Sequence, residues 1–168
     1  MSTVSLVKTK GNAEKDIDKA VREAIDLIGG LKDIVKPGFK VLIKPNLVAP
    51  AKERLSGAIT RYEICKTIAD MVKELGATPI IAESSAAGVD TEKTIVFGEY
   101  DKLRDLGYEV VDLKKSKKKD IRMENGVIVN DYPLQVEREA VEWIGGMIVC
   151  SPSNKIDDFT NLRISEFI

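Results

Sequence analysis

Polar side chains that can bind an anion follow several short apolar runs of this chain. Lys44 and Asn46 come directly after the run 41–43, and Glu83 and Ser84 come directly after the run 79–82. Ammonium, amide and hydroxyl groups can donate to a carboxylate or a phosphate, and a glutamate can accept from a hydroxyl or help to ligate a metal. The candidate ligand-binding residues are Lys44, Asn46, Glu83, Ser84 and, after the last apolar run, Lys155.

Each of these groups also has a purely structural interpretation. Lys44-Pro45-Asn46 is a typical end of a strand, since proline lacks the N–H of the sheet ladder and asparagine suits turns. Glu83 and Ser84 are equally typical of the start of a loop that leads into a helix. Spacing alone leaves both interpretations open.

The residue types present exclude several kinds of catalysis. The chain contains no histidine, which rules out Ser-His-Asp and Cys-His catalysis and every histidine-containing metal site. Its two cysteines, Cys65 and Cys150, cannot supply the four thiolates of an iron–sulfur cluster from one copy of the chain. No glycine-rich nucleotide-binding motif occurs. Glu83 is the candidate base, and the reaction, the cofactor and enzyme activity itself stay open.

Composition indicates a cytoplasmic globular protein with a charged exterior. Apolar residues make up 43%, charged residues 32% and aromatic residues 5%, and the formal net charge is -1. A balanced charge and few aromatic residues argue against nucleic acid and anionic membranes as partners. No apolar run approaches the ~20 residues that span a bilayer, and the N-terminus lacks a signal-peptide pattern. A homo-oligomer is left open.

The order of elements predicts an α/β fold. We expect strands over 4–7, 40–43, 79–82, 108–113 and 147–150, alternating with helices over 12–28, 60–75 and 91–106. Asn12 is the expected cap of the first helix, and Thr60 to Glu63 match a capping box for the second. Such alternation is typical of a three-layer sandwich around a mostly parallel sheet. Parallel strands would place the candidate residues at one edge of that sheet.

The remainder of the chain departs from this alternation. Asn125-Gly126 lies between the segments 120–123 and 127–129, which predicts a small β-hairpin near 120–130. A short helix is expected over 137–143. The block 114–119, with five lysines, is expected to be a solvated loop. We expect a single domain over 1–168 with an irregular tail over 151–168.

Several blocks resemble the domain of unknown function number 362, an uncharacterised family often found with ferredoxin-type iron–sulfur modules. The blocks are "VLIKPNLV" at 41–48, "GAIT" at 57–60, "ELGATPIIAESS" at 74–85, "TIVFGEYDKLRDLGYEVVDL" at 94–113 and "MIVCSPSNK" at 147–155. The resemblance implies an α/β fold with Lys44, Asn46 and Glu83 at the most characteristic positions.

This chain departs from the family pattern at two places and in its extent. A histidine-proline pair usually follows the family's threonine, where this chain has Arg61-Tyr62 after Thr60. The family's Pro-x-x-Lys-Thr-His segment appears here as Pro152 to Asp157, which keeps Lys155 and lacks the histidine. The family's domain also extends further, so the resemblance implies a member that is shortened or diverged at its C-terminus.

Two classes of function follow. The first is a binding site for a small anionic molecule or a metal–ligand complex at the carboxyl edge of the sheet, with no reaction assigned. The second is a non-catalytic interaction module for an iron–sulfur or redox partner, which would carry its cluster on another chain. A remnant that keeps only the fold is a third reading.

Overall fold

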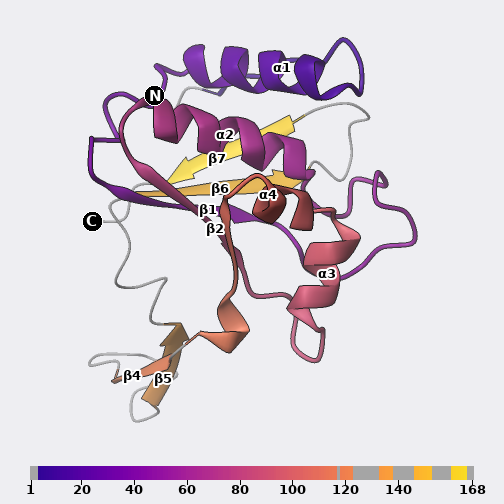
Figure 1. Ribbon diagram of the computed structural model, residues 1–168, viewed down its shortest axis with the longest axis vertical. Helices are drawn as coiled ribbons and strands as arrows, with labels where there is room; N and C mark the ends of the chain where they lie inside the picture. Colours follow the sequence, from indigo (N-terminus) through magenta and orange to yellow (C-terminus); the bar gives the residue numbers. More distant parts are fainter. Residues whose placement is uncertain (1–3, 117, 123–132, 138–145, 153–159, 166–168) are drawn as a thin grey trace.

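The computed structural model describes residues 4–116, 118–122, 133–137, 146–152 and 160–165. Its main sheet has the strand order β3-β2-β1-β6-β7. The strands are β1 (Lys40–Pro45), β2 (Thr78–Glu83), β3 (Glu109–Asp112), β6 (Gly146–Pro152) and β7 (Thr160–Ser165). Strand β1 pairs in parallel with β2 and β6, β2 pairs in parallel with β3, and β7 runs antiparallel to β6. An α/β fold with a mostly parallel sheet is thereby confirmed (Figure 1).

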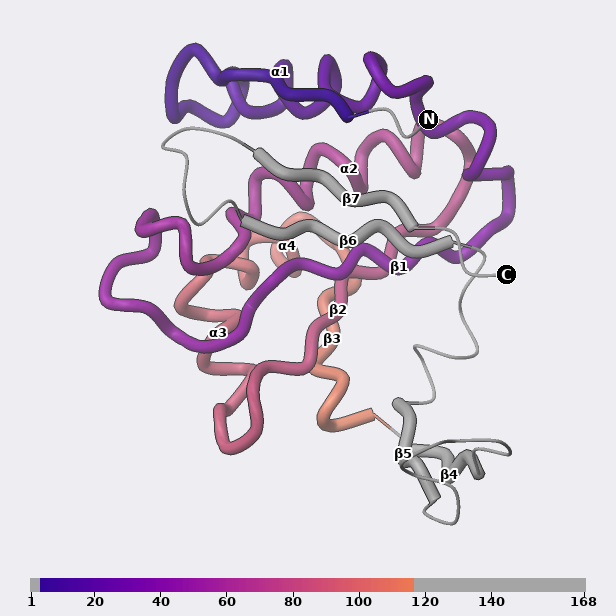
Figure 2. The backbone as a smooth tube through the Cα atoms, turned by 180° about the vertical axis from the view of Figure 1, so that it is seen from behind, coloured from indigo at the N-terminus to yellow at the C-terminus, as the bar shows by residue number. Residues whose placement is uncertain are grey.

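The strand register brings the expected chain segments to one edge. Ile43 pairs with Ile81, and Glu83 pairs with Asp112. Because these strands are parallel, the loops that follow them leave the sheet on the same side (Figure 2). We call this edge the carboxyl rim and define it by residues 44–48, 83–86 and 112–115.

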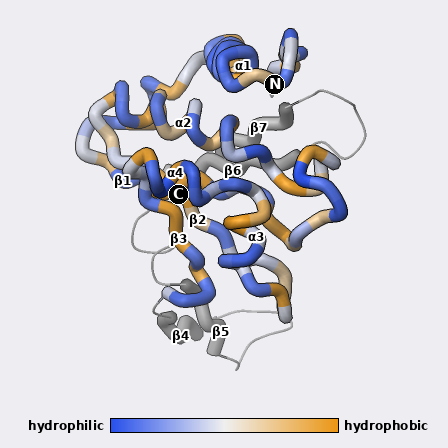
Figure 3. Tube along the Cα trace, turned by 45° about the vertical axis from the view of Figure 1, so that its right-hand side comes forward, coloured by the Kyte–Doolittle hydropathy of each residue, from blue (hydrophilic) through white to orange (hydrophobic). Residues whose placement is uncertain are grey.

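The helices pack on one face of the sheet. They are α1 (Glu14–Asp26), α2 (Tyr62–Glu74), α3 (Thr91–Phe97) and α4 (Asp101–Asp105), and α1 and α2 lie side by side in Figures 1 and 2. Each contributes to one core cluster with strand residues of that face, among them Ile17, Ile68, Ile95, Leu103, Val41, Ile43 and Ile81. Hydrophilic residues predominate along α1, whose buried positions recur at helical spacing (Figure 3).

The opposite face of the sheet carries a separate, smaller cluster. Leu42 and Ala82 alternate with the residues of the first face and contact Leu113. Among the described residues no α-helix contributes to this cluster. The third layer expected from the sequence is therefore not seen in the described part of the chain. No helix in that part is long and apolar enough to cross a membrane.

Both expected helix caps are wrong, because the side chains take tertiary partners instead. Helix α1 begins after Ala13, and Asn12 Oδ1 accepts a hydrogen bond from Arg61 Nη1 at 2.8 Å. Helix α2 begins after Arg61 without a side-chain cap. The Thr60 hydroxyl accepts from the backbone N–H of Asn46 at 3.0 Å, so it serves the carboxyl rim rather than the helix.

Several expected elements have different bounds. The helix expected over 91–106 is divided into α3 and α4, where Glu99 adopts a positive φ of 61°. The strand expected over 4–7 is absent, and an isolated bridge occurs at Lys8. The tail 151–168 is not irregular throughout, because Thr160–Ser165 forms β7, in which Leu162 and Ile164 alternate with polar residues.

A two-stranded antiparallel sheet stands where the hairpin was expected. Strand β4 (Lys118–Arg122) pairs with β5 (Pro133–Glu137). The second strand therefore lies later in the chain than the expected segment 127–129. That segment, the Asn125-Gly126 turn and residues 138–143 of the expected short helix lie outside the described residues.

Candidate functional site

The carboxyl rim brings Lys44 and Glu83 into direct contact. Lys44 lies at the end of β1 and Glu83 at the end of β2, and Lys44 Nζ donates to Glu83 Oε2 at 2.9 Å. The Glu83 side chain is 4% exposed, whereas that of Lys44 is 38% exposed. The Lys44 ammonium is therefore partly exposed to solvent, whereas the Glu83 carboxylate that it contacts is buried.

The Glu83 carboxylate also joins the loops that follow β1 and β2. Its Oε2 accepts from the backbone N–H of Leu47 at 3.2 Å, and its Oε1 accepts from the backbone N–H of Ser84 at 2.7 Å. With the Lys44 bond, both oxygens are occupied. This is the arrangement of a group that positions the ammonium and the two loops, rather than that of an open general base.

Asn46 forms hydrogen bonds that hold the loop after β1. Its Nδ2 donates to Ala58 O at 3.2 Å, and its backbone N–H and carbonyl bond Thr60 Oγ1 and the Thr60 N–H at 3.0 and 2.9 Å. The Asn46 side chain thus ties the start of the long loop 47–58 to its end. Its proposed role in ligand binding stays a prediction.

Two buried hydroxyl groups that are not among the candidate ligand-binding residues form hydrogen bonds in and next to the rim. Ser85 Oγ donates to Leu47 O at 2.5 Å, and the Ser85 N–H donates to Thr91 Oγ1 at 3.1 Å. Ser85 and Thr91 are 4% and 1% exposed, so these bonds are internal. Ser85 lies next to Ser84 in the resembling block 74–85, which was the available signal, whereas no spacing rule pointed to Thr91.

The third loop of the rim begins after Asp112, which is 7% exposed. Asp112 Oδ1 accepts from the backbone N–H of Lys114 at 3.0 Å and so caps the 3-10 helix Leu113–Lys115. Lys115 Nζ lies 3.5 Å from Asp112 Oδ2 and 3.9 Å from Glu92 Oε2. A hydrogen bond from Arg104 is the main reason that the pKa of Glu92 is lowered.

Of the candidate residues, the structure describes four. Lys44, Asn46, Glu83 and Ser84 share the rim, and Lys155 lies outside the described residues. In the described part of the chain, no group of three or more cysteine, aspartate or glutamate side chains has the arrangement to hold a metal ion. Cys65 is a buried free thiol 3.4 Å from the Tyr100 hydroxyl, which donates to Thr60 O at 3.0 Å.

The N-terminus of α2 lies next to the rim, but a carboxylate of the chain itself stands in its first turn. Glu63 in its first turn is 5% exposed and accepts from Arg61 Nη2 at 2.8 Å. Arg54 Nη1 lies 3.7 Å from Glu63 Oε2. The negative charge of this first-turn carboxylate offsets the positive end of the helix dipole, although no side chain caps the helix.

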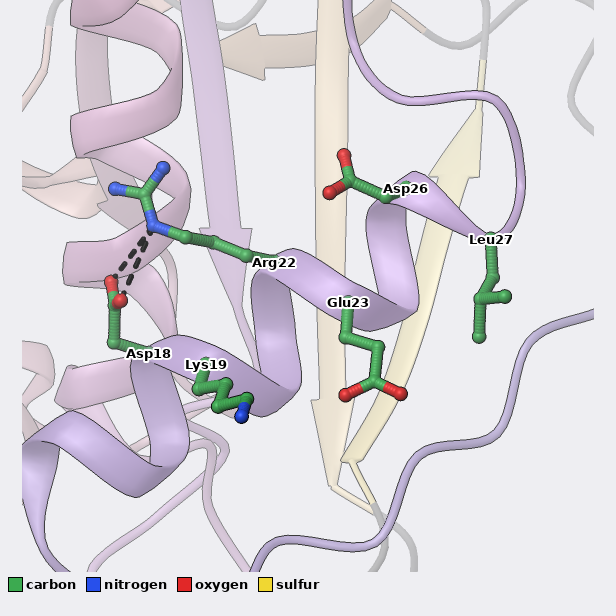
Figure 4. A pocket seen from close by; sticks show the side chains of 6 residues that line it. All are labelled: Asp18, Lys19, Arg22, Glu23, Asp26 and Leu27. Carbon is green, nitrogen blue, oxygen red and sulfur yellow. Dashed lines mark hydrogen bonds and ion pairs between the residues drawn. The ribbon is translucent and has the colours of Figure 1, made fainter.

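A separate hollow lies on α1, far from the candidate residues in sequence and on another element. Figure 4 shows its lining, which consists of Asp18, Lys19, Arg22, Glu23, Asp26 and Leu27. Arg22 is turned toward Asp18 and donates to it at 3.1 Å, and it also bonds Glu74 at 2.8 Å. Its guanidinium is therefore neutralised within the protein, and the hollow offers less to an anion than the rim does.

Comparisons with known proteins agree with the resemblance seen in the sequence. A thylakoid-associated protein of Synechocystis sp. (strain ATCC 27184 / PCC 6803 / Kazusa) is 33% identical over 91 residues, which are 52% of this chain and 27% of that protein. The chain thus spans about a quarter of the length of this curated relative. No solved structure matches. The family model of the domain of unknown function DUF362 matches residues 41–145, more than half of the chain, and the chain belongs to this family.

Proposed function

We propose that the carboxyl rim binds a small anionic molecule, or a metal–ligand complex that carries negative charge, with Lys44 as the main contact. The observation that carries this proposal is the partly exposed Lys44 ammonium, fixed 2.9 Å from a buried carboxylate. An ammonium has three N–H groups, and the one described bond to Glu83 leaves two for a ligand. A fixed donor loses less entropy on binding than a mobile surface lysine.

The surrounding groups fit roles in the same site. The backbone and hydroxyl of Ser84 lie at the start of the loop that Glu83 holds, and Asn46 lies at the start of the loop that Thr60 closes. Glu83 acts as the positioning group for Lys44. We assign no reaction, since both Glu83 oxygens are engaged and Asp112, the other described carboxylate of the rim, is engaged by the Lys114 N–H and by Lys115.

Thermal unfolding in the presence of small anions tests this function. Acetate, inorganic phosphate and citrate would be compared at fixed ionic strength on the wild type, Lys44→Met and Lys73→Met. Lys73 is a suitable control because it stacks on Tyr108 at the opposite edge of the sheet. A ligand at 100 times its Kd adds ~2.7 kcal/mol, which is ~5–10 °C in a chain of this size.

We expect at least one anion to stabilise the wild type and Lys73→Met and to lose most of its effect in Lys44→Met. Equal stabilisation of all three proteins would remove Lys44 from the site. If no anion at millimolar concentration raised the melting temperature, the proposed class of ligand would be wrong.

The alternative function, an interaction module for an iron–sulfur or redox partner, stays a prediction, and so does a cytoplasmic location. Capture of a cysteine-rich ferredoxin-like protein by the tagged chain would support that alternative. Because one relative is described as thylakoid-associated, cell fractionation should compare soluble and membrane fractions. Recovery of the chain with the membranes would contradict the cytoplasmic location.

A further inference from the structure

A second lysine, Lys114, binds the loop that follows β2 from the side opposite Lys44. Lys114 Nζ donates to the backbone carbonyls of Ala86 and Val89, both at 2.7 Å. Lys44 contacts the beginning of the same loop through Glu83. In the strand order β3-β2-β1, Lys44 comes from β1 and Lys114 follows β3, so the two lysines flank the loop.

The charge of Lys114 is not neutralised by the residues around it that the structure describes. Its two hydrogen bonds go to neutral carbonyl groups, and no ion pair joins its ammonium to a described carboxylate. Two acidic residues that contact the neighbouring Lys115 have partners of their own, since Asp112 is paired with Lys115 and Glu92 is paired with Arg104. Lys114 Nζ therefore has no described acidic partner, and its two described hydrogen bonds leave one N–H group for a ligand.

The positive ends of two described helices near this edge, α2 and α3, are offset by carboxylates of the chain itself. Helix α3 is capped by its own Asp90, whose Oδ1 accepts from the N–H groups of Glu92 and Lys93 at 3.0 and 3.3 Å. Glu63 lies in the first turn of α2, where it is paired with Arg61. In a chain whose net charge is -1, five lysines nevertheless fall within residues 114–119, directly after β3. Within the described rim, positive charge is carried by the side chains of Lys44, Lys114 and Lys115.

We propose that the ligand of the rim carries two separate anionic groups, the first bound by Lys44 and the second by Lys114. This inference rests on the proposed function and specifies its ligand class. Strands β1 and β3 are separated by one intervening strand, and two strand spacings amount to ~10 Å. The matching ligand is an elongated small molecule with an anionic group at each end, such as a bisphosphate or a long dicarboxylate.

Titration calorimetry with matched probes tests the inference. Inorganic phosphate is compared with a hexose 1,6-bisphosphate, and propionate with adipate, on the wild type, Lys44→Met, Lys114→Met, Lys114→Arg and the control Lys73→Met. We expect the two-ended probe of at least one pair to bind the wild type and the control about 10-fold more tightly than its one-ended partner. Lys114→Met should abolish that advantage, and Lys114→Arg should keep it.

The outcomes separate this inference from the proposed function. Equal affinity of one-ended and two-ended probes for the wild type overturns the inference, even if Lys114→Met proves too unstable to study. If both kinds of probe then lose binding in Lys44→Met, the proposed function stands without it. If binding is unchanged in Lys44→Met, the proposed function fails, and the two-lysine arrangement fails with it.

Discussion

Removing either member of the Lys44–Glu83 pair should destabilise the protein, and Glu83 should matter more. Lys44→Met removes one charge-assisted hydrogen bond of 2.9 Å, a class of bond that contributes ~1.5–3 kcal/mol. Because the Lys44 side chain is 38% exposed, water can replace part of that interaction. We therefore expect a loss at the lower end, ~1.5 kcal/mol.

Glu83→Gln changes a group that is 4% exposed and accepts three N–H donors. A glutamine has one acceptor oxygen, so its NH2 group must face at least one donor, such as the Ser84 N–H. A buried N–H left without an acceptor costs ~1–3 kcal/mol, to which the weakened Lys44 bond adds. We expect a total of ~3 kcal/mol, with the loops after β1 and β2 released from each other.

Urea unfolding of the two single variants and the double variant measures these values. With a slope of ~2 kcal/mol/M, the midpoint should fall by ~0.75 M for Lys44→Met and ~1.5 M for Glu83→Gln. The double variant should lose about as much as Glu83→Gln alone, because both changes break the same bond. A double variant whose loss equals the sum, or a larger loss for Lys44→Met, would refute the described geometry.

Three further predictions concern groups outside the rim. Burial and a hydrogen bond to Asp70 raise the pKa of Tyr108 from 10.0 to about 12, so its contribution is complete below pH 10 and is lost as the pH rises toward 12. Tyr108→Phe should cost ~1 kcal/mol at pH 7 and flatten that alkaline decline in pH-dependent urea midpoints. Arg104 lowers the pKa of Glu92 from 4.5, so this contribution is present above pH 4.5 and is lost as the pH falls through the lowered value. Arg104→Met should cost ~1 kcal/mol at pH 7 and less at pH 3, and an equal cost at both would contradict the pairing. A Cβ at Gly98 would lie 3.0 Å from a buried tyrosine ring, so Gly98→Ala should lower the melting temperature by several degrees, at ~1–3 kcal/mol.

The parallel core and its rim could be predicted because their signals are local and the geometry is general. Short apolar runs separated by amphipathic stretches specify parallel strands, and parallel strands share a carboxyl edge. This rule predicted that Lys44 and Glu83 lie at the same edge of the sheet, whereas their direct hydrogen bond was not predicted. Hydrophobic periodicity therefore predicted the edge of the sheet at which the candidate residues lie, without any information on side-chain geometry.

Predictions that depended on a choice between local and tertiary partners were less successful. Asn12 and Thr60 have the right types and positions for helix caps, yet Arg61 and the Asn46 N–H are their partners in the fold. A capping hydrogen bond contributes only ~1 kcal/mol, so a single tertiary hydrogen bond of similar strength is enough to replace it. The sequence shows which side chains can bond, but not which of several partners is buried and in need of one.

Pro45 explains why side chains must supply hydrogen-bond partners to the backbone of the rim. Proline has no N–H, and the regular pairing of β1 with β2 extends only to Ile43 and Ile81. The backbone groups that follow still require partners, and side chains supply them: Thr60 for Asn46, and Glu83 and Ser85 for Leu47. Glu83 is thus required by the fold, since a carboxylate can accept all of its N–H donors at once.

The stability of the fold depends less on Lys44 than on Glu83. The two backbone N–H donors already engage both oxygens of Glu83, and water can replace part of the interaction with the partly exposed Lys44 ammonium. The ammonium at the end of β1 instead remains partly open to solvent, with donors to spare. Lys44-Pro45-Asn46 therefore both ends a strand and orients a cation. If Lys44→Met left anion binding intact while lowering stability, only the first of these roles would remain.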